Sequence, residues 1–387
     1  MKIKKSICLL LTLVLTFSVF AKDFDAVYGI YQIKINDNAG SFCLFVEDPR
    51  SEKFVPVLNP LGNFSRNKFY LKAGNRFYPL SKIDGVPFTY EINQTCTTMT
   101  YSVKGVADVK FIFTFVNSRT GQAENADMAI VDALITNKGR VTKNYTLKVV
   151  FDTMLGESYI SHFATDKLKA LNTEAVFTSM VADHWIKSAN DNISLKFLFN
   201  GPSISNPTNV SVANINLLST DNWEPKLVPG RGYNSLFSIN NSAISATWPS
   251  YKLVPEAKCN VRFYITTAVL GDETPDAKSP FFTTGMAEKN LKDYKDKEKF
   301  INAEIEEYAI LSSNDSPVEP VSAYKNDKNV PDSDNLPKIA PEKVNQEYIN
   351  ELLAKIEEVQ KNPDQYTQDK VLQLNTELDA VLKMLGQ

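Results

Sequence analysis

The sequence predicts a mainly β protein: a large antiparallel two-sheet β-sandwich of the supersandwich type, followed by a C-terminal α-helical hairpin. From residue 25 to about 271, roughly fourteen short runs rich in Val, Ile, Phe, Tyr and Thr alternate with Asn, Asp, Gly and Pro. No helical pattern intervenes, which is typical of antiparallel strands joined by short turns. Apolar residues at helical spacing occur only later in the chain. We therefore assign the sandwich to residues 22–285.

The first 21 residues have the pattern of a secretory signal peptide. Lys2, Lys4 and Lys5 precede an apolar run, and Val19 and Ala21 are small residues at the −3 and −1 positions of a cleavage site. No later segment has the roughly 18 uncharged apolar residues of a membrane span. We therefore expect an exported protein, periplasmic or secreted, without a membrane span after cleavage.

Charge and cysteine content narrow the function classes. Without the three signal-peptide lysines, the 42 basic residues become 39 against 45 acidic ones, a net charge of about −6 with no basic cluster. Nucleic-acid binding is not expected, because it needs a concentrated positive surface. Cys43, Cys96 and Cys259 remain after cleavage, and either one disulfide with a free thiol or three thiols is compatible with their wide spacing.

The local pattern supports individual elements of this organisation. The stretch "TYSVKGVADVKFIFTFV" places two β-rich runs around a turn at Lys104 and Gly105, which predicts a hairpin. Residues 286–313 carry Leu291 and Tyr294 at helical spacing among many charges, which predicts an amphipathic helix packed on the sandwich.

The C-terminal region divides into a linker and a hairpin. Residues 314–343 contain five prolines and few large apolar side chains, which predicts a disordered linker. Residues 344–387 contain two apolar stripes at helical spacing, which predict two antiparallel helices. Two helices bury little surface, so we expect them to bind a partner protein, a second copy or the sandwich. The residues expected to make that contact are Leu352, Ile356, Val371, Leu374 and Leu378.

The stretch "KVVFDTMLGESYISHF" at residues 148–163 is the best candidate for catalysis. An apolar strand runs into Asp152 and Glu157, and His162 follows. An aspartyl protease needs Asp-Thr-Gly twice, but Met154 replaces the glycine and the motif occurs once. Phosphoryl transfer of the haloacid dehalogenase type needs a second aspartate at position 154. Neither chemistry is supported.

A metal site in this stretch is a weaker alternative. Asp152 and Glu157 could bind Ca²⁺ through loop carboxylates, but the spacing matches no metal-binding signature and no other cofactor is indicated. The favoured interpretation is structural: the stretch ends a core strand and turns the chain. Asp152 or Thr153 caps the turn, Gly156 supplies an unusual backbone angle, and Glu157 begins the next segment. Nucleophile-elbow, Walker A, C-x-x-C and dinucleotide-binding motifs are also missing from the sequence.

Aromatic residues in a Gly-, Pro- and Asn-rich segment give a further signal. Exposed rings on loops can stack on sugars or bind a protein partner. The alternative is that Trp223 and Trp248 belong to the core between the sheets. The predicted ligand or partner surface consists of Trp223, Arg231, Tyr233, Trp248 and Tyr251.

The runs "ALITNKGRVTKNYTLKVVFDTMLGE", "HFAT" and "GYNSLFSINNSAISATWPSYKLVPEA" resemble the body of exported bacterial β-sandwich proteins of the spirochaete-like periplasmic type. The resemblance covers residues 25–275, rests on general pattern and carries no catalytic residues. It implies a role associated with the envelope or with periplasmic flagella. By fold analogy alone, His162 or His184 with Glu174 would imitate the His and carboxylate pairs of mutarotase-like sandwiches.

Two function classes follow. The first is a non-enzymatic exported interaction or structural protein, in which the sandwich carries a tethered helical hairpin for protein association. The second is a carbohydrate-binding or carbohydrate-active, mutarotase-like sandwich. A sugar epimerase or lyase that uses His162 or His184 is a third hypothesis. The sequence favours a protein without catalytic activity.

Overall fold

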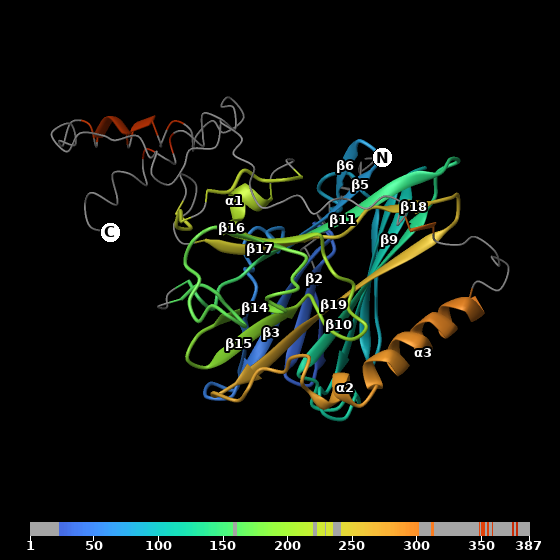
Figure 1. Ribbon diagram of the computed structural model, residues 1–387, viewed down its shortest axis with the longest axis horizontal. Coiled ribbons are helices and arrows are strands. Elements are labelled where there is room, and N and C mark those ends of the chain that lie inside the picture. The colour runs from blue at the N-terminus through green and yellow to red at the C-terminus, as the bar shows by residue number, and fades with distance from the viewer. Residues whose placement is uncertain are drawn as a thin grey trace, which may run out of the picture.

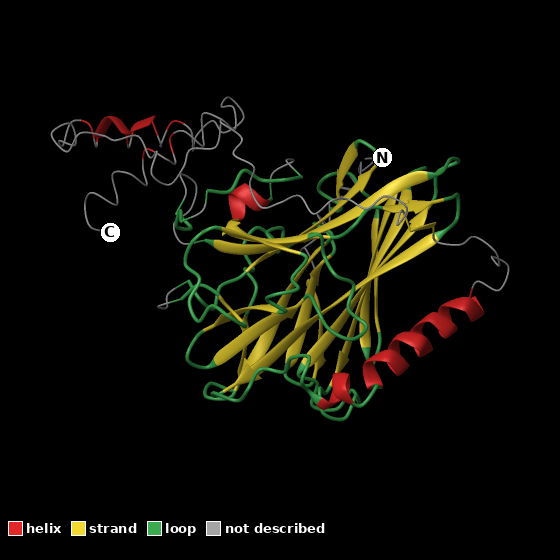
Figure 2. Cartoon of the chain, viewed as in Figure 1, coloured by secondary structure: helices red, strands yellow, loops and turns green. Residues whose placement is uncertain are grey.

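The computed structural model describes residues 23–157, 161–219, 223–228, 230–234, 241–301 and 311–312, with 348, 350–352, 354–355, 358, 374 and 377. The predicted signal peptide (1–21) and linker (314–343) lie outside the described residues, as does most of the predicted hairpin. Every strand pairing among the described residues is antiparallel, which confirms the predicted class. Strands dominate the molecule (Figure 2).

Sheet 1 is built from the N-terminal part of the chain and has four strands in sequence order. Its strands are β1 (Asp23–Tyr28), β2 (Tyr31–Asn36), β3 (Ser41–Asp48) and β4 (Lys53–Pro56).

Sheet 2 has eight strands and forms one layer of the sandwich. In spatial order they are β12 (Ala164–Thr165), β14 (Trp185–Ala189), β15 (Ile193–Leu198), β19 (Lys258–Val269), β10 (Met128–Asn137), β9 (Ala107–Val116), β8 (Cys96–Val103) and β7 (Phe88–Ile92). The β8–β9 pair confirms the predicted hairpin, and Gly105 has the positive φ of 68° that its turn requires.

Sheet 3 also has eight strands and is centred on β11 (Lys143–Asp152). β5 (Lys68–Ala73) pairs with β11 and with β6 (Arg76–Pro79). The other strands are β13 (Ala175–Thr178), β16 (Asn209–Asn214), β17 (Ser242–Thr247), β18 (Tyr251–Leu253) and β20 (Leu311–Ser312).

Sheets 1 and 3 both pack against sheet 2 and enclose a single large core. Aromatic contacts cross between the layers: Phe42 of β3 lies 5.0 Å from Phe113 of β9, and Phe151 of β11 lies 5.3 Å from Phe197 of β15 between ring centroids. β10 is buried along its whole length, because its other face is covered as well. The covering residues are Phe281 and Phe282, which lie outside the two-sheet sandwich.

Three helices cover the outer faces of sheets 2 and 3. α1 (Ile215–Leu218) packs on the outer face of sheet 3, whereas α2 (Pro280–Thr283) packs on the outer face of sheet 2. α3 (Met286–Ile301) begins beside α2. Figure 1 shows α1 beside β16 and β17, and α2 and α3 on the opposite side of the molecule.

α3 confirms an amphipathic helix on the sandwich over residues 286–301 of the predicted segment 286–313. Ala287 is buried in the α2 contact, and Arg262 of β19 hydrogen-bonds Asn290 and lies over the ring of Tyr294. Leu311–Ser312 is not helical but pairs with β18 as β20. The helical prediction is therefore wrong at its C-terminal end, where backbone pairing replaces the helix.

The three cysteines are free thiols. Cys43 and Cys259 are buried, and burial raises the pKa of each thiol well above its ordinary value. Cys96 is half-buried at the start of β8. Of the two arrangements compatible with the sequence, the structure has the one without a disulfide.

Candidate functional site

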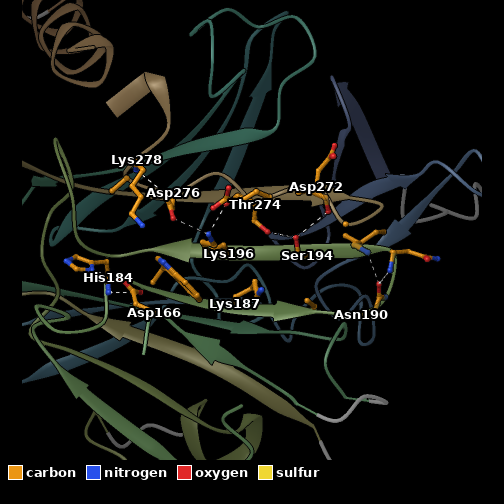
Figure 3. Close-up of a pocket in the computed structure, with 18 of the residues that line it drawn as sticks. Asp166, His184, Lys187, Asn190, Ser194, Lys196, Asp272, Thr274, Asp276 and Lys278 are labelled. Carbon is orange, nitrogen blue, oxygen red and sulfur yellow. Dashed lines mark hydrogen bonds and ion pairs between the residues drawn. The ribbon is translucent and has the colours of Figure 1, made fainter. Parts of the chain in front are cut away.

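A groove of about 750 Å³ lies on the outer face of sheet 2, over β14, β15 and the end of β19 (Figure 3). Side chains alternate between the two faces of a strand, so residues two apart share a face. Leu195 and Phe197 point into the core, which places Ser194 and Lys196 on the outer face. Lys187 of β14 lies directly opposite Lys196 in the strand register and completes the floor.

Lys196 is the most buried charged group of the groove, at 5% exposure. Its ammonium donates to the carbonyl oxygen of Thr274 at 2.8 Å and lies 3.6 Å from Asp276 Oδ2. It also lies 4.5 Å from the centre of the Trp185 ring. Burial lowers the pKa of Lys196, and the Asp276 carboxylate partly offsets this effect. These three contacts fix the position of the ammonium in the floor.

The loop of residues 271–278 forms one wall and is anchored to the sheet by hydroxyl groups. Ser194 Oγ hydrogen-bonds Thr274 Oγ1, and Thr266 Oγ1 donates to the carbonyl oxygen of Pro275 at 2.7 Å. The backbone N–H of Lys278 donates to Asp276 Oδ1 at 2.8 Å, which orders the turn around Asp276. The wall is therefore held by side chains of the groove floor itself.

Asp166 and His184 stand at one end of the groove. His184 Nδ1 lies 2.6 Å from Asp166 Oδ2, and the His184 backbone N–H donates to Asp166 Oδ1 at 3.1 Å. The two carboxylate oxygens therefore orient the imidazole through its backbone and its ring. The His184 side chain is 45% exposed, so its second ring nitrogen, Nε2, is on the open side of the pair. In Figure 3 both residues lie away from Ser194 and Asn190.

The sequence candidates Asp152, Glu157 and His162 come together elsewhere, where β11 ends beside the start of β17. Ser242 joins two of them: its backbone N–H donates to Glu157 Oε1 at 2.9 Å, and its hydroxyl lies 3.1 Å from His162 Nδ1. Arg66 Nη1 lies 3.4 Å from Asp152 Oδ2. We call Arg66, Asp152, Glu157, His162, Asn241 and Ser242 the Asp152 cluster.

Asn241 closes the cluster around the aspartate. With its amide oriented by its neighbours, Asn241 Nδ2 donates to Asp152 Oδ1 at 2.7 Å and its oxygen accepts from Arg66. Asp152 is fully buried, so its charge is compensated by long-range partners and not by its own turn. The core strand β11 ends at Asp152 and a turn follows, as expected, but the Asp152 side chain binds Arg66 and Asn241 and does not cap that turn.

Burial dominates the electrostatics of this cluster. It raises the pKa of Asp152 to about 7, against the opposing effect of Arg66. It raises the pKa of Glu157 to about 8, and the Asp152 carboxylate adds to that increase. It lowers the pKa of His162. Each shift favours the neutral form, as expected for groups enclosed by protein.

Gly156 has a different function from the one predicted. Its backbone has no positive φ, but a Cβ at this position would lie 2.2 Å from the carbonyl oxygen of His162. The glycine is required because two backbone segments approach closely, not because the chain adopts an unusual angle.

Glu174 is unavailable as a partner for either histidine. Its carboxylate accepts from Arg231 Nε at 2.7 Å and from Arg231 Nη2 at 2.9 Å in a buried, two-bond ion pair, and from the Val228 N–H at 2.8 Å. Tyr233 is buried and packs its ring against His162. The predicted surface role of Arg231 and Tyr233 is therefore wrong, because both hold their loop onto the sandwich.

The remaining predicted aromatic residues divide between core and surface. Trp248 is 1% exposed and belongs to the core, so its predicted surface role is wrong. Tyr251 is half-buried against the same core. Trp223 is half-buried and stacks on the exposed ring of Phe77, with 5.5 Å between centroids. Lys72 lies over both rings.

Two of the five residues predicted to make the hairpin contact are among the described residues. Leu352 and Leu374 are helical and buried. The Tyr348 hydroxyl hydrogen-bonds Glu377, which links the two segments predicted to be helices. Ile356, Val371 and Leu378 lie outside the described residues.

A search of the described residues finds no group of three or more His, Cys, Asp or Glu side chains placed to hold a metal ion. Calcium at Asp152 and Glu157 would have to displace the bonds from Arg66, Asn241 and Ser242. Within the same residues, no helix is long and apolar enough to cross a membrane.

Sequence reasoning missed the groove. The available signal was Lys196 within the apolar run "ISLKFLF" of residues 193–199. A lysine there must face away from the core, and a buried outward lysine requires a partner. That partner, the loop of residues 271–278, is about 80 residues away in the sequence and could not be identified from it.

No family model matches the chain, and no curated protein sequence matches it. Among solved structures, it is similar to a galactose mutarotase-like protein from Lactobacillus casei, with 8% identity over 64% of this chain and 100% of that chain (TM-score 0.41). An aldose epimerase homologue from C. elegans shares 10% identity over 65% and 100% of the two chains (TM-score 0.36). A putative aldose 1-epimerase from Escherichia coli K12 shares 10% over 64% and 99% (TM-score 0.36). These likenesses assign no function to the groove.

Proposed function

We propose that this chain is an exported protein that binds carbohydrate in the groove on sheet 2. The observation that supports this proposal is the groove itself, which combines a volume of about 750 Å³ with hydrogen-bonding groups held at fixed positions. Ligand sites are usually concave and mainly apolar, with a few polar groups that orient the ligand. Here polar side chains form most of the lining, which suits a ligand covered with hydroxyl groups.

The fixed groups match the hydrogen bonds of such a ligand. The ammonium of Lys196 is positioned by Thr274, Asp276 and Trp185, so little side-chain entropy is lost when a hydroxyl oxygen binds nearby. The side chain of Asn190 accepts from the backbone N–H of Asn192 at 2.9 Å, which leaves its amide N–H groups free to donate. Preorganised donors and acceptors of this kind favour binding of a polar ligand.

Binding without catalysis is the better-supported form of this proposal. The hydroxyl of Ser194 is bonded to Thr274 and not to a base. A nucleophilic serine would need a base within hydrogen-bonding distance. The described residues of the groove are thus arranged to hold a ligand, and the oriented imidazole of His184 serves as one more polar contact at its end.

The test is direct binding. The full chain is screened on a glycan array, and hits are measured by calorimetry for the wild type and for Lys187→Ala and Asn190→Ala. Both variants should weaken binding at least about fivefold without changing the melting temperature. Lys104→Ala, at the exposed β8–β9 turn, is the matched control and should bind normally. No binding to any glycan, or equal affinity in all four proteins, would contradict the proposal.

We propose protein association through the C-terminal helices as a second function, supported by the Tyr348–Glu377 bond between the two segments predicted to be helices. Leu352 and Leu374 are already buried within the chain, so a partner would contact other residues of these helices. Export to the periplasm, and an envelope- or flagellum-associated partner, belong to this part of the proposal. Truncation after Ser313 should leave the thermal transition of the sandwich in place but reduce the mass measured by light scattering or abolish partner capture from an envelope fraction. Unchanged mass and capture would contradict it.

A further inference from the structure

The groove has two ends that differ in charge. One end is formed by two turns, Asn190–Asn192 between β14 and β15, and Gly271–Glu273 after β19. The backbone N–H of Leu270 donates to the carbonyl oxygen of Asn192 at 2.8 Å, which holds the two turns side by side. The other end contains His184 and Lys278, and Lys187 lies in the floor between the two ends, opposite Lys196. Figure 3 shows Asn190 and Asp272 at one end, and His184 and Lys278 at the other.

The turn end is acidic. Asp191, Asp272 and Glu273 line it and are exposed, and no lysine or arginine among the groove-lining residues belongs to these turns. Within the described part of the chain, none of these three carboxylates is in an ion pair with a basic side chain. Glu273 interacts electrostatically with Lys196, so Asp191 and Asp272 provide the negative charge that faces the groove without an ion-pair partner among the described residues.

Two lysines without an ion-pair partner in the part of the chain that the structure describes, Lys187 in the floor and Lys278 at the opposite end, face this part of the groove. Its two acidic residues are already engaged: Asp166 binds His184, and Asp276 is beside Lys196. Lys187 and Lys278 have no acidic partner among the described residues. Lys187 also lies directly opposite Lys196 across the β14–β15 pair, and like charges opposite one another on a sheet are destabilising.

An anionic group bound at this end would reduce that repulsion. It would contact the ammonium of Lys187 and the exposed ammonium of Lys278, with Lys196 fixed below. A protonated amine at the turn end would gain from Asp191 and Asp272 in the same way. Neither gain is available to a neutral ligand, and a ligand with the charges reversed would be repelled at both ends.

Building on the proposed function, we infer that the preferred ligand is a charged oligosaccharide with two opposite groups. It carries an acidic group, such as a carboxylate, on the sugar that reaches Lys187 and Lys278, and an amino group on the sugar at the Asp191–Asp272 end. The positions of the unpaired lysines and of the exposed carboxylates fix the order of the two groups along the groove.

The experiment uses the full chain and four matched disaccharides: neutral, with a uronic acid, with an amino sugar, and with both. Calorimetry at low salt should rank the doubly charged disaccharide first, each single charge about fivefold weaker, and the neutral disaccharide weakest. Raising the salt to about 1 M should remove most of the difference, because exposed charges are screened.

Charge-reversal variants assign each preference to one end. Lys187→Glu should abolish the advantage of the uronic acid and retain that of the amino sugar, and Asp272→Lys should do the opposite. Lys104→Glu and Asp84→Lys, on distant turns, are the controls and should change neither preference.

The outcomes separate the two proposals. Equal affinity for all four disaccharides, an advantage from only one charge, or variants that leave the preferences unchanged would overturn the inference and leave carbohydrate binding intact. A failure of every disaccharide to bind would overturn carbohydrate binding as well.

Discussion

The groove on sheet 2 and the Asp152 cluster contain similar side chains in opposite environments. Each has carboxylates, a histidine and a basic residue. In the groove, Asp166 and His184 are partly exposed and Asp272 is exposed. In the cluster, Asp152 is fully buried and His162 is 8% exposed. The cluster shows the larger pKa shifts, whereas the groove provides the space for a ligand. Strongly shifted pKa values therefore do not mark the proposed ligand site, because burial alone produces them.

The largest expected effect tests how tightly the cluster is enclosed. Gly156→Ala should destabilise the fold by about 3 kcal/mol or more, because the new methyl group would overlap the His162 backbone. Gly232→Ala is the matched control: it also lacks a positive φ, but nothing lies within 4 Å of its Cβ position. Chemical denaturation measures both. Similar losses in the two variants would show that the close approach is unimportant.

The next effect tests whether the groove has its own structural support. Lys196→Met should cost about 1–3 kcal/mol, because it leaves Asp276 and the Thr274 carbonyl without their buried partner. It should also weaken ligand binding, since the groove loses the ammonium of its floor and the wall of residues 271–278 loses one of its contacts with the sheet. Lys187→Met, at the opposite position on β14, should change stability by less than about 0.5 kcal/mol. Equal stability losses in the two variants would contradict this difference.

The stability of the fold should depend on pH through the buried carboxyl groups of the Asp152 cluster. The folded-state pKa of Glu157 is raised to about 8, so the folded state holds this proton more tightly than the unfolded chain. Its contribution to stability is therefore complete below the unfolded pKa of about 4.5 and is lost as the pH rises through about 8. Glu157→Gln retains an oxygen for the Ser242 N–H but cannot ionise.

We expect the wild-type melting temperature to fall by a few degrees between pH 5 and 9, and Glu157→Gln to reduce that fall. The Asp152 carboxyl, with a pKa raised to about 7, contributes in the same direction and explains why the fall will not vanish. Calorimetric melting curves at several pH values provide the measurement. A variant with the same pH dependence as the wild type would show that Glu157 is not enclosed as described.

The smallest effect concerns the exposed pair at the end of the groove. Asp166→Asn should change the free energy of unfolding by less than about 0.5 kcal/mol, because exposed ion pairs contribute little. If the imidazole of His184 contacts the ligand, affinity should still fall because its ring is no longer oriented. A large loss of stability would show that the Asp166–His184 pair is buried like the Asp152 cluster, and would contradict its description as exposed.

Much of the fold was predictable from local pattern. The β8–β9 hairpin follows from two β-rich runs around Gly105, and α3 follows from the helical spacing of Leu291 and Tyr294. Both depend on residues close in sequence. The end of α3 was less predictable, because Leu311–Ser312 pairs with β18, a strand about 60 residues earlier.

The candidate sites were less predictable. Trp223 and Trp248 occur in similar Gly- and Pro-rich sequence, yet one lies at the surface beside Phe77 and the other lies in the core. Asp152 was recognisable as a strand-terminal acid, but its partners Arg66 and Asn241 are 86 and 89 residues away in the chain. No spacing rule relates such residues.

The antiparallel β class and the amphipathic character of α3 follow from local pattern, because alternation and helical periodicity are properties of neighbouring residues in the chain. Which carboxylates are buried and which line a groove depends instead on how distant strands and loops pack against each other. The same alternation that defines β15 as a strand puts Lys196 on its outer face, but only the loop of residues 271–278 makes that face a groove.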